Sequence, residues 1–142
     1  MEMTKAIDWA SSQKHAVLIT LRKDGRAQSS DIIYVLEDGR FVISLTDSRA
    51  KTKNMIRDPR IVLHITEPDS WSYVSFDGTV ELSAVTTDLD DATNDALVRY
   101  YEDVTGEPHS DWAEYRQAMV DEGRLLATVT PTSVVGQING VS

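Results

Sequence analysis

A short basic segment near the middle of the chain carries the clearest chemical signal. Between residues 49 and 60 lie five of the chain's 14 Lys and Arg residues, namely Arg49, Lys51, Lys53, Arg57 and Arg60, with Asp58 as the only acid. The segment has a net charge of +4 in a chain whose net charge is −9. A bound anion, such as a phosphate or a carboxylate, would explain this concentration of cations.

The position of these cations on a predicted helix strengthens the anion hypothesis. The helix is expected to begin at about Ser48, a good N-cap residue, with first-turn N–H groups free to face an anion. Arg49 and Lys51 would lie in this first turn, where cations oppose the helix dipole unless an anion accompanies them. The alternative is a solvated basic helix face, since Arg49, Lys53 and Arg57 follow i, i+4 spacing.

Composition indicates one ordinary globular domain over residues 1–142. The chain is 41% hydrophobic and 26% charged, as soluble proteins are. It contains no cysteine, which excludes disulfides, thiolate chemistry and iron–sulfur clusters. Its three histidines, His15, His64 and His109, lack the spacing of metal ligands, so no metal site is predicted.

Charge and hydropathy also limit the partners. A net charge of −9 argues against binding to nucleic acid or to an anionic membrane. The first residues lack the basic start and apolar centre of a signal peptide, and no apolar run reaches the roughly 20 residues of a membrane helix. We therefore expect a cytoplasmic protein.

Periodicity predicts a mainly β fold with inserted helices. Strands are expected at residues 15–21, 27–37, 40–45, 60–66, 71–85, 125–131 and 133–138, and helices at 4–13, 88–105 and 111–122 besides the one after Ser48. The helix at 111–122 is expected to be capped by Ser110 and to end at Gly123. Asp-Gly pairs at 24–25 and 38–39 predict hairpins, so the first 45 residues should form an antiparallel meander. Residues 15–21, apolar at almost every position, are expected to be buried on both faces. The pattern indicates a small barrel of six or more antiparallel strands.

Two further features fit either a binding site or ordinary packing, and a third predicts a bend in a strand. Gln28, Ser30 and Ile32 share one face of a strand, which either lines a cofactor cleft or faces solvent. Trp71 either packs in the core or stacks against a planar cofactor. Asp77-Gly78 is expected to form a bulge or tight bend.

Four motifs together resemble a known family. They are Ala-Val-Leu-Ile-Thr-Leu with Asp-Gly-Arg (16–26), Ser-Arg-Ala-Lys-Thr-Lys-Asn with Arg-Asp-Pro-Arg (48–60), Trp-Ser-Tyr with Gly-Thr-Val-Glu-Leu (71–82), and His-Ser-Asp-Trp with Tyr-Arg-Gln-Ala-Met (109–119). The chain resembles the pyridoxamine-phosphate-oxidase-like split-barrel superfamily over residues 15–136. The similarity is greatest to the PPOX-class enzymes that use the deazaflavin coenzyme F420.

The resemblance implies a split β-barrel homodimer with a cofactor cleft at each end of the subunit interface. It implies that Arg49, Lys51 and Thr52, with the Ala50 backbone, hold the coenzyme's phosphate, and that Asn54 steadies the loop. Residues facing the deazaflavin ring and its linker would be Thr20, Gln28, Ser30 and Ser44, while Trp71 would come from the partner subunit.

The resulting prediction is an F420-dependent reductase that transfers a hydride between the coenzyme and a small conjugated or unsaturated molecule. Two alternatives remain open. One is an FMN-binding oxidoreductase of the same fold, and the other is a non-catalytic F420 or flavin carrier. No protein group is assigned a catalytic role, because the chemistry would belong to the cofactor.

Overall fold

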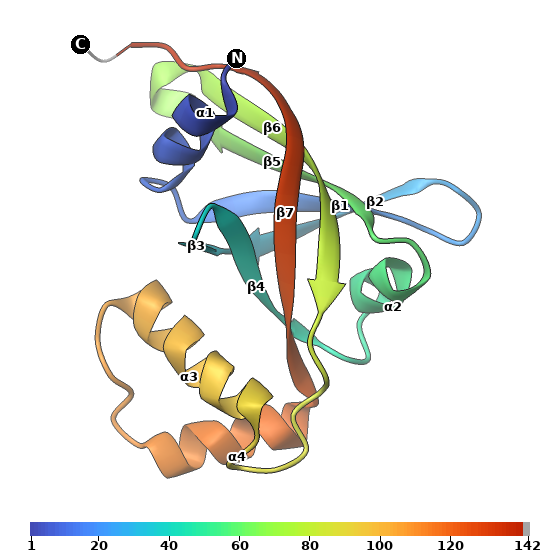
Figure 1. Ribbon diagram of the computed structural model, residues 1–142, viewed down its shortest axis with the longest axis vertical. Coiled ribbons are helices and arrows are strands. Elements are labelled where there is room, and N and C mark those ends of the chain that lie inside the picture. The colour runs from blue at the N-terminus through green and yellow to red at the C-terminus, as the bar shows by residue number, and fades with distance from the viewer. Residues whose placement is uncertain (141–142) are drawn as a thin grey trace.

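The computed structural model describes residues 1–140, which form one curled antiparallel sheet with helices at its ends (Figure 1). The elements are α1 (Met3–Ala10), β1 (His15–Leu21), β2 (Ala27–Ile33), β3 (Val35–Glu37), β4 (Arg40–Thr46), α2 (Ala50–Arg57), β5 (Arg60–Glu67), η1 (Pro68–Ser70), β6 (Ser72–Leu82), α3 (Ala92–Thr105), α4 (Trp112–Glu122) and β7 (Arg124–Gln137). The seven strands follow the order β2-β1-β5-β6-β7-β4-β3. Because β2 and β3 end the order without pairing with each other, the barrel is split, as predicted.

The predicted meander is wrong at Tyr34. The run 27–37 divides there into β2 and β3, which lie at opposite edges of the sheet. Tyr34 is buried, its ring meets Phe41 edge-on at 5.1 Å, and its hydroxyl donates a 2.6 Å hydrogen bond to the Ala10 carbonyl oxygen. The buried tyrosine thus fixes the point where the chain crosses from one edge of the barrel to the other.

The core fills the concave side of the sheet. Alternate residues of each strand point inwards, among them Leu18, Phe41, Leu63 and Phe76, and all four are fully buried. The expectation that β1 is buried on both faces is wrong, since Val17 and Ile19 on its convex face remain partly exposed. Although β1 is apolar at almost every position, no other part of the chain fully covers its convex face.

Helices cover the two ends of the barrel and part of its convex side. Ala6 and Ala10 of α1 and Met55 of α2 belong to the main core. The helices α3 and α4 lie side by side below the sheet in Figure 1 and form a second cluster with β4 and β7, through Leu97 of α3 and Leu126 of β7. Within residues 1–140, no helix combines the length and the apolarity needed to cross a membrane.

Local sequence signals explain most element ends. Gly123 ends α4 with a φ of 64°, as expected. The predicted cap Ser110 is wrong, because Asp111 caps α4 by accepting a hydrogen bond from the Glu114 backbone N–H. The register shift predicted at Asp77-Gly78 is confirmed. The two predicted closing strands form the single long strand β7, which pairs with β6 and β4.

Candidate cofactor-binding cleft

A cleft of about 550 Å³ lies at the split of the barrel, between the edge strand β2, the strand β4 and the helix pair. Strands β2 and β4 are not hydrogen-bonded neighbours, so the sheet is open between them. The lining comes from β1, β2, β4, α2, α3, α4 and β7, and comprises His15, Asp31, Ile32, Ile33, Ser44, Lys51, Tyr100, Tyr101, Val104, Thr105, Tyr115, Met119 and Arg124. Separate segments of the chain therefore build one site.

Cations gather at the α2 end of this cleft. Lys51 and Arg124 both line it, and Arg49 directly precedes α2. Partial burial lowers the pKa of Lys51, and the neighbouring charges of Arg49 and Arg124 lower it further. Glu122 pairs with Arg124 at 3.0 Å but does not balance the group. Such an arrangement is unfavourable by itself and favours a bound anion.

The start of α2 supplies backbone donors to the same place. The N-cap is Arg49 rather than the predicted Ser48, and the Arg49 side chain makes no capping hydrogen bond. Arg49 has extended backbone angles (φ −73°, ψ 148°), so the first-turn N–H groups beginning at Ala50 face outwards. Thr52 is buried, and its hydroxyl donates to the Thr46 carbonyl oxygen at 2.7 Å, which fixes the turn from β4 into α2.

A buried amide anchors α2 to the first hairpin. The Asn54 side-chain N–H group donates to the Thr20 hydroxyl and to the Gln28 amide oxygen, both at 3.0 Å. Arg57 donates to the Asn54 amide oxygen and to the Leu21 carbonyl oxygen, both at 2.9 Å. Arg57 is therefore bound to the protein rather than being part of a purely solvated basic face. These bonds hold the cationic helix end in a fixed place.

The rings of Tyr100 and Tyr115 form the wall of the cleft opposite the strands, called the tyrosine wall below. The Tyr100 hydroxyl donates to the Ile33 carbonyl oxygen at 2.9 Å, and the Tyr115 hydroxyl donates to the Leu97 carbonyl oxygen at 2.7 Å. Burial raises the pKa of Tyr100 and raises that of Tyr115 to about 12. Both rings are thus neutral at physiological pH and present an uncharged, planar surface suited to a planar ligand.

The residues singled out from the sequence fall into three groups. Ser44 and Lys51 line the cleft, with Arg49 and Ala50 at its cationic end. Thr20, Gln28, Thr52 and Asn54 lie behind it in the bonds that position α2, and Ser30 is half-buried on the same face of β2 as Gln28. Trp71 does not line the cleft; it is 84% exposed and precedes β6, next to Ser72, which pairs with Glu67 at the end of β5 remote from α2.

Sequence reasoning missed Arg124 and gave the tyrosines no part in the site. Arg124 begins β7 and pairs in register with Thr46, the last residue of β4, which brings it beside α2. Thr46 and Arg124 are 78 positions apart in the sequence, so only the strand order reveals that they are neighbours. The spacing of Tyr100, Tyr101, Val104 and Thr105 on α3 did signal a shared helix side.

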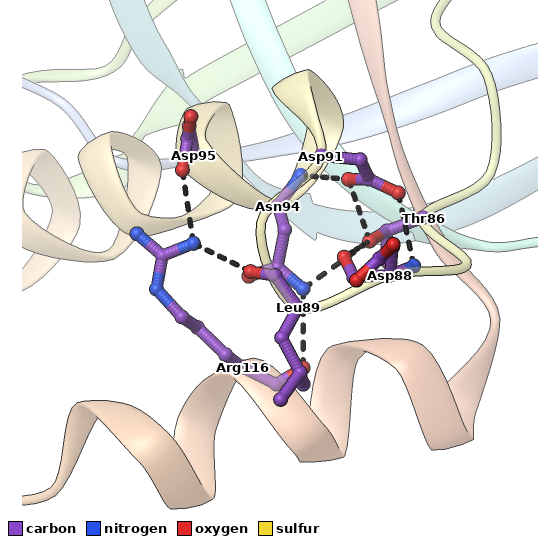
Figure 2. Close-up of polar contacts among 7 residues, drawn as sticks. All are labelled: Thr86, Asp88, Leu89, Asp91, Asn94, Asp95 and Arg116. Atoms are coloured by element: carbon purple, nitrogen blue, oxygen red, sulfur yellow. Dashed lines mark hydrogen bonds and ion pairs between the residues drawn. The ribbon is translucent and has the colours of Figure 1, made fainter.

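A polar network holds the helix pair against the barrel (Figure 2). Asn94, fully buried on α3, donates to the Thr86 hydroxyl at 3.2 Å and to the Arg116 carbonyl oxygen of α4 at 3.1 Å. The Arg116 guanidinium donates to the Leu89 carbonyl oxygen and to the Asp95 carboxylate at 2.7 and 2.9 Å. Thr86 in turn donates its backbone N–H to the carbonyl oxygen of Arg124. The tyrosine wall is thereby linked to the cationic end.

No three His, Cys, Asp or Glu side chains in residues 1–140 are grouped as a metal site requires.

Comparison with known proteins identifies this architecture. A family model described as pyridoxamine 5'-phosphate oxidase matches residues 3–136. The fold is similar to that of a conserved hypothetical protein from Mycobacterium tuberculosis (22% identity, 96% of this chain and 84% of that chain, TM-score 0.73). It is also similar to an F420 reductase (22% identity, 86% and 89%, TM-score 0.62) and to a heme-binding protein from Mycobacterium smegmatis (19% identity, 95% and 53%, TM-score 0.70).

Asp91 tests the role of the network behind the tyrosine wall. Burial acts to raise its pKa, but hydrogen bonds from the Thr87 and Asn94 N–H groups and the Thr86 hydroxyl outweigh this and lower the pKa to about 2. Asp91→Ala should lower the free energy of unfolding by about 1 kcal/mol or more at pH 7, measured by urea denaturation. Exposed Asp90 provides the control Asp90→Ala, which should change stability little.

The pH dependence follows from the direction of the shift. The folded-state pKa lies below the unfolded one, so the Asp91 carboxylate stabilises the protein above about pH 4 and loses this effect as the pH falls towards 2. The stability difference between wild type and Asp91→Asn should therefore shrink over that range. A difference that stays constant from pH 7 to pH 2 would contradict the assigned role.

Proposed function

Because the chain belongs to the pyridoxamine 5'-phosphate oxidase family, we propose that its cleft binds coenzyme F420 and that the protein reduces a small conjugated organic molecule. One observation carries the proposal. Arg49, Lys51 and Arg124 converge on the uncapped start of α2, where the cleft with its tyrosine wall begins. This arrangement suits a ligand with an anionic group at one end and a planar ring system at the other.

The residues present suit such a coenzyme. Arg49, Lys51 and the first backbone N–H groups of α2 would hold its phosphate, with Arg124 completing the cationic end. Ser44, beside Lys51 in the cleft, would contact the linker or ring, and the rings of Tyr100 and Tyr115 would cover the ring plane. The bound deazaflavin would supply the hydride chemistry, while the protein would supply binding, orientation and electrostatics.

Two related functions remain as alternatives, each with an observation in its favour. FMN also carries a phosphate and a planar ring, so the same cleft would accept it. The added cation Arg124 in the cleft favours F420, which has the longer and more acidic tail. A non-catalytic carrier is the other alternative, since proteins of similar fold include a heme-binding protein and a heme storage protein from Vibrio cholerae.

A paired titration tests the proposed cofactor. Purified protein is titrated with F420 and with FMN at one fixed salt concentration, and binding is followed by fluorescence. We expect tighter binding of F420, followed by oxidation of the reduced coenzyme when a conjugated acceptor is added. Preference for FMN would favour the flavin alternative, and tight binding without turnover on any acceptor would favour the carrier.

Lys51 provides a direct test of the anion site. Lys51→Ala should weaken F420 binding by roughly 1.5–3 kcal/mol, because a charged hydrogen bond to the phosphate is lost. The matched control is Lys53→Ala, which removes an exposed lysine from the same helix and should have a much smaller effect. The lowered pKa of Lys51 also predicts that affinity falls with rising pH earlier than an ordinary lysine would cause. Unchanged affinity of Lys51→Ala would exclude this phosphate site.

We propose further that two copies of the chain associate through the convex face of the sheet. Register places Val17, His64, Ser75 and Val135 in one row across β1, β5, β6 and β7, and Val135 is 66% exposed. Trp71 projects near this face with 84% of its surface exposed. A second copy would bury Val17 and Val135 and would bring its Trp71 to the cleft.

The dimer is tested by size-exclusion chromatography with light scattering at micromolar concentration. Wild type should elute as a dimer, whereas Val135→Asp should dissociate because a buried charge opposes association. Leu89→Asp introduces the same charge at a partly exposed site away from this face and should remain dimeric. A monomeric wild-type protein would contradict the shared-cleft arrangement.

A further inference from the structure

The end of the cleft remote from α2 carries an imidazole. His15 and Asp31 both line the cleft, whereas β1 contacts α2 near its other end, through Thr20. Strand rise places His15 about 17 Å from Thr20 along β1. In the β1–β2 pair His15 lies opposite Ile33 and Asp31 opposite Val17, so both side chains lie on one face. The imidazole is thus separated from the phosphate end but within the same cleft.

Most other proton-bearing groups of the cleft are already committed. The hydroxyls of Tyr100 and Tyr115 donate to the backbone carbonyl oxygens of Ile33 and Leu97, and the Thr105 hydroxyl donates to that of Tyr101. Lys51 and Arg124 lie at the end proposed for the phosphate. Ser44 is assigned to the linker or ring of the coenzyme, so Tyr101 is the remaining rival, since its hydroxyl has no hydrogen bond within residues 1–140.

We propose that His15 donates the proton that completes reduction of the substrate; this inference rests on the proposed function. Imidazole is the side chain best suited to exchange protons near neutral pH. Tyr101 is the weaker candidate because its ring is surrounded edge-on by His109, Trp112 and Tyr115, at centroid distances of 5.0 to 5.7 Å. These contacts mark Tyr101 as a packing residue.

The step balances for an α,β-unsaturated carbonyl substrate. Its β-carbon receives a hydride from the reduced deazaflavin, the C=C π pair shifts towards the α-carbon and the carbonyl oxygen, and an enolate forms. The His15 imidazolium gives one proton to this enolate and becomes neutral, and solvent then returns a proton to the imidazole. The substrate gains one hydride and one proton, and the coenzyme is oxidised by two electrons.

Several charged or titratable groups lie around His15 on neighbouring elements. Asp31 lies on the paired strand β2, Tyr101 lies on α3, and Lys14 precedes His15 in the chain. Asp103 of α3 borders an adjoining pocket together with Lys14. Any of these groups would affect the wild-type pH–activity curve, so the curve must be compared with that of a His15 variant.

The first test uses 2-cyclohexen-1-one as the acceptor and follows oxidation of reduced F420. His15→Asn should lower kcat by roughly 10²-fold or more, the usual contribution of a general acid, with F420 affinity within about twofold of wild type. Wild-type activity should fall at alkaline pH, and this fall should be absent in His15→Asn. Added imidazole should partly restore His15→Ala. Tyr101→Phe and Lys14→Gln should retain most activity.

The second test needs neither coenzyme nor turnover. 4-Nitrophenolate resembles an enolate, and its addition should shift the NMR signal of the His15 imidazole, identified by its absence from the spectrum of His15→Asn. An unmoved His15 signal would overturn the inference.

The kinetic outcomes separate this inference from the function on which it rests. If His15→Asn keeps the wild-type rates and pH profile, the inference is overturned but the proposed reductase function stands. If only Tyr101→Phe loses activity, the proton donor is Tyr101 and the inference is likewise overturned. Absence of F420 binding or turnover in wild type would overturn the proposed function, and the inference with it.

Discussion

The accumulation of like charge at the start of α2 is the constraint on which the site depends. Arg49, Lys51 and Arg124 come together where the helix dipole is also positive, and no side chain caps the helix. Partial burial lowers the pKa of Lys51, and the charges of Arg49 and Arg124 lower it further, so this arrangement disfavours the charged lysine in the unliganded protein. An anion bound at this place would offset the repulsion, so the proposed cofactor would bind where the unliganded protein is electrostatically unfavourable.

The fold keeps these charges from moving apart. Thr52 ties α2 to the end of β4, and Asn54 ties it to β1 and β2 through buried hydrogen bonds. Arg124 is held by its register with Thr46 and by the hydrogen bond from Thr86, which belongs to the network behind α3 and α4. A buried network of this kind resists relaxation, because losing one bond leaves a buried polar group unpaired. The same bonds therefore position both the cationic end and the tyrosine wall.

Local patterns in the sequence predicted much of the fold but little of its three-dimensional arrangement. The strands, the helix pair, the Gly123 helix end and the Asp77–Gly78 bulge follow from short-range signals. The crossing at Tyr34 could not be predicted, because it depends on where a buried ring and its hydroxyl find partners on α1 and β4. Arg49 and Lys51 were recognisable from charge density, whereas Arg124 joins them only through the pairing of β4 with β7.

The convex face of β1 would link the cleft to the proposed association of two copies of the chain. Its apolar sequence suggested burial on both faces, yet only the concave face is covered within one chain. The convex face carries Val17 and Ile19 and also presents His15 at the rim of the cleft. A strand this apolar is stabilised by a partner on each side. A second copy on the convex face would cover the apolar residues and at the same time enclose the open side of the cleft. Cofactor binding and association would then stabilise one another, because the cleft and the proposed dimer face both include β1 and β7.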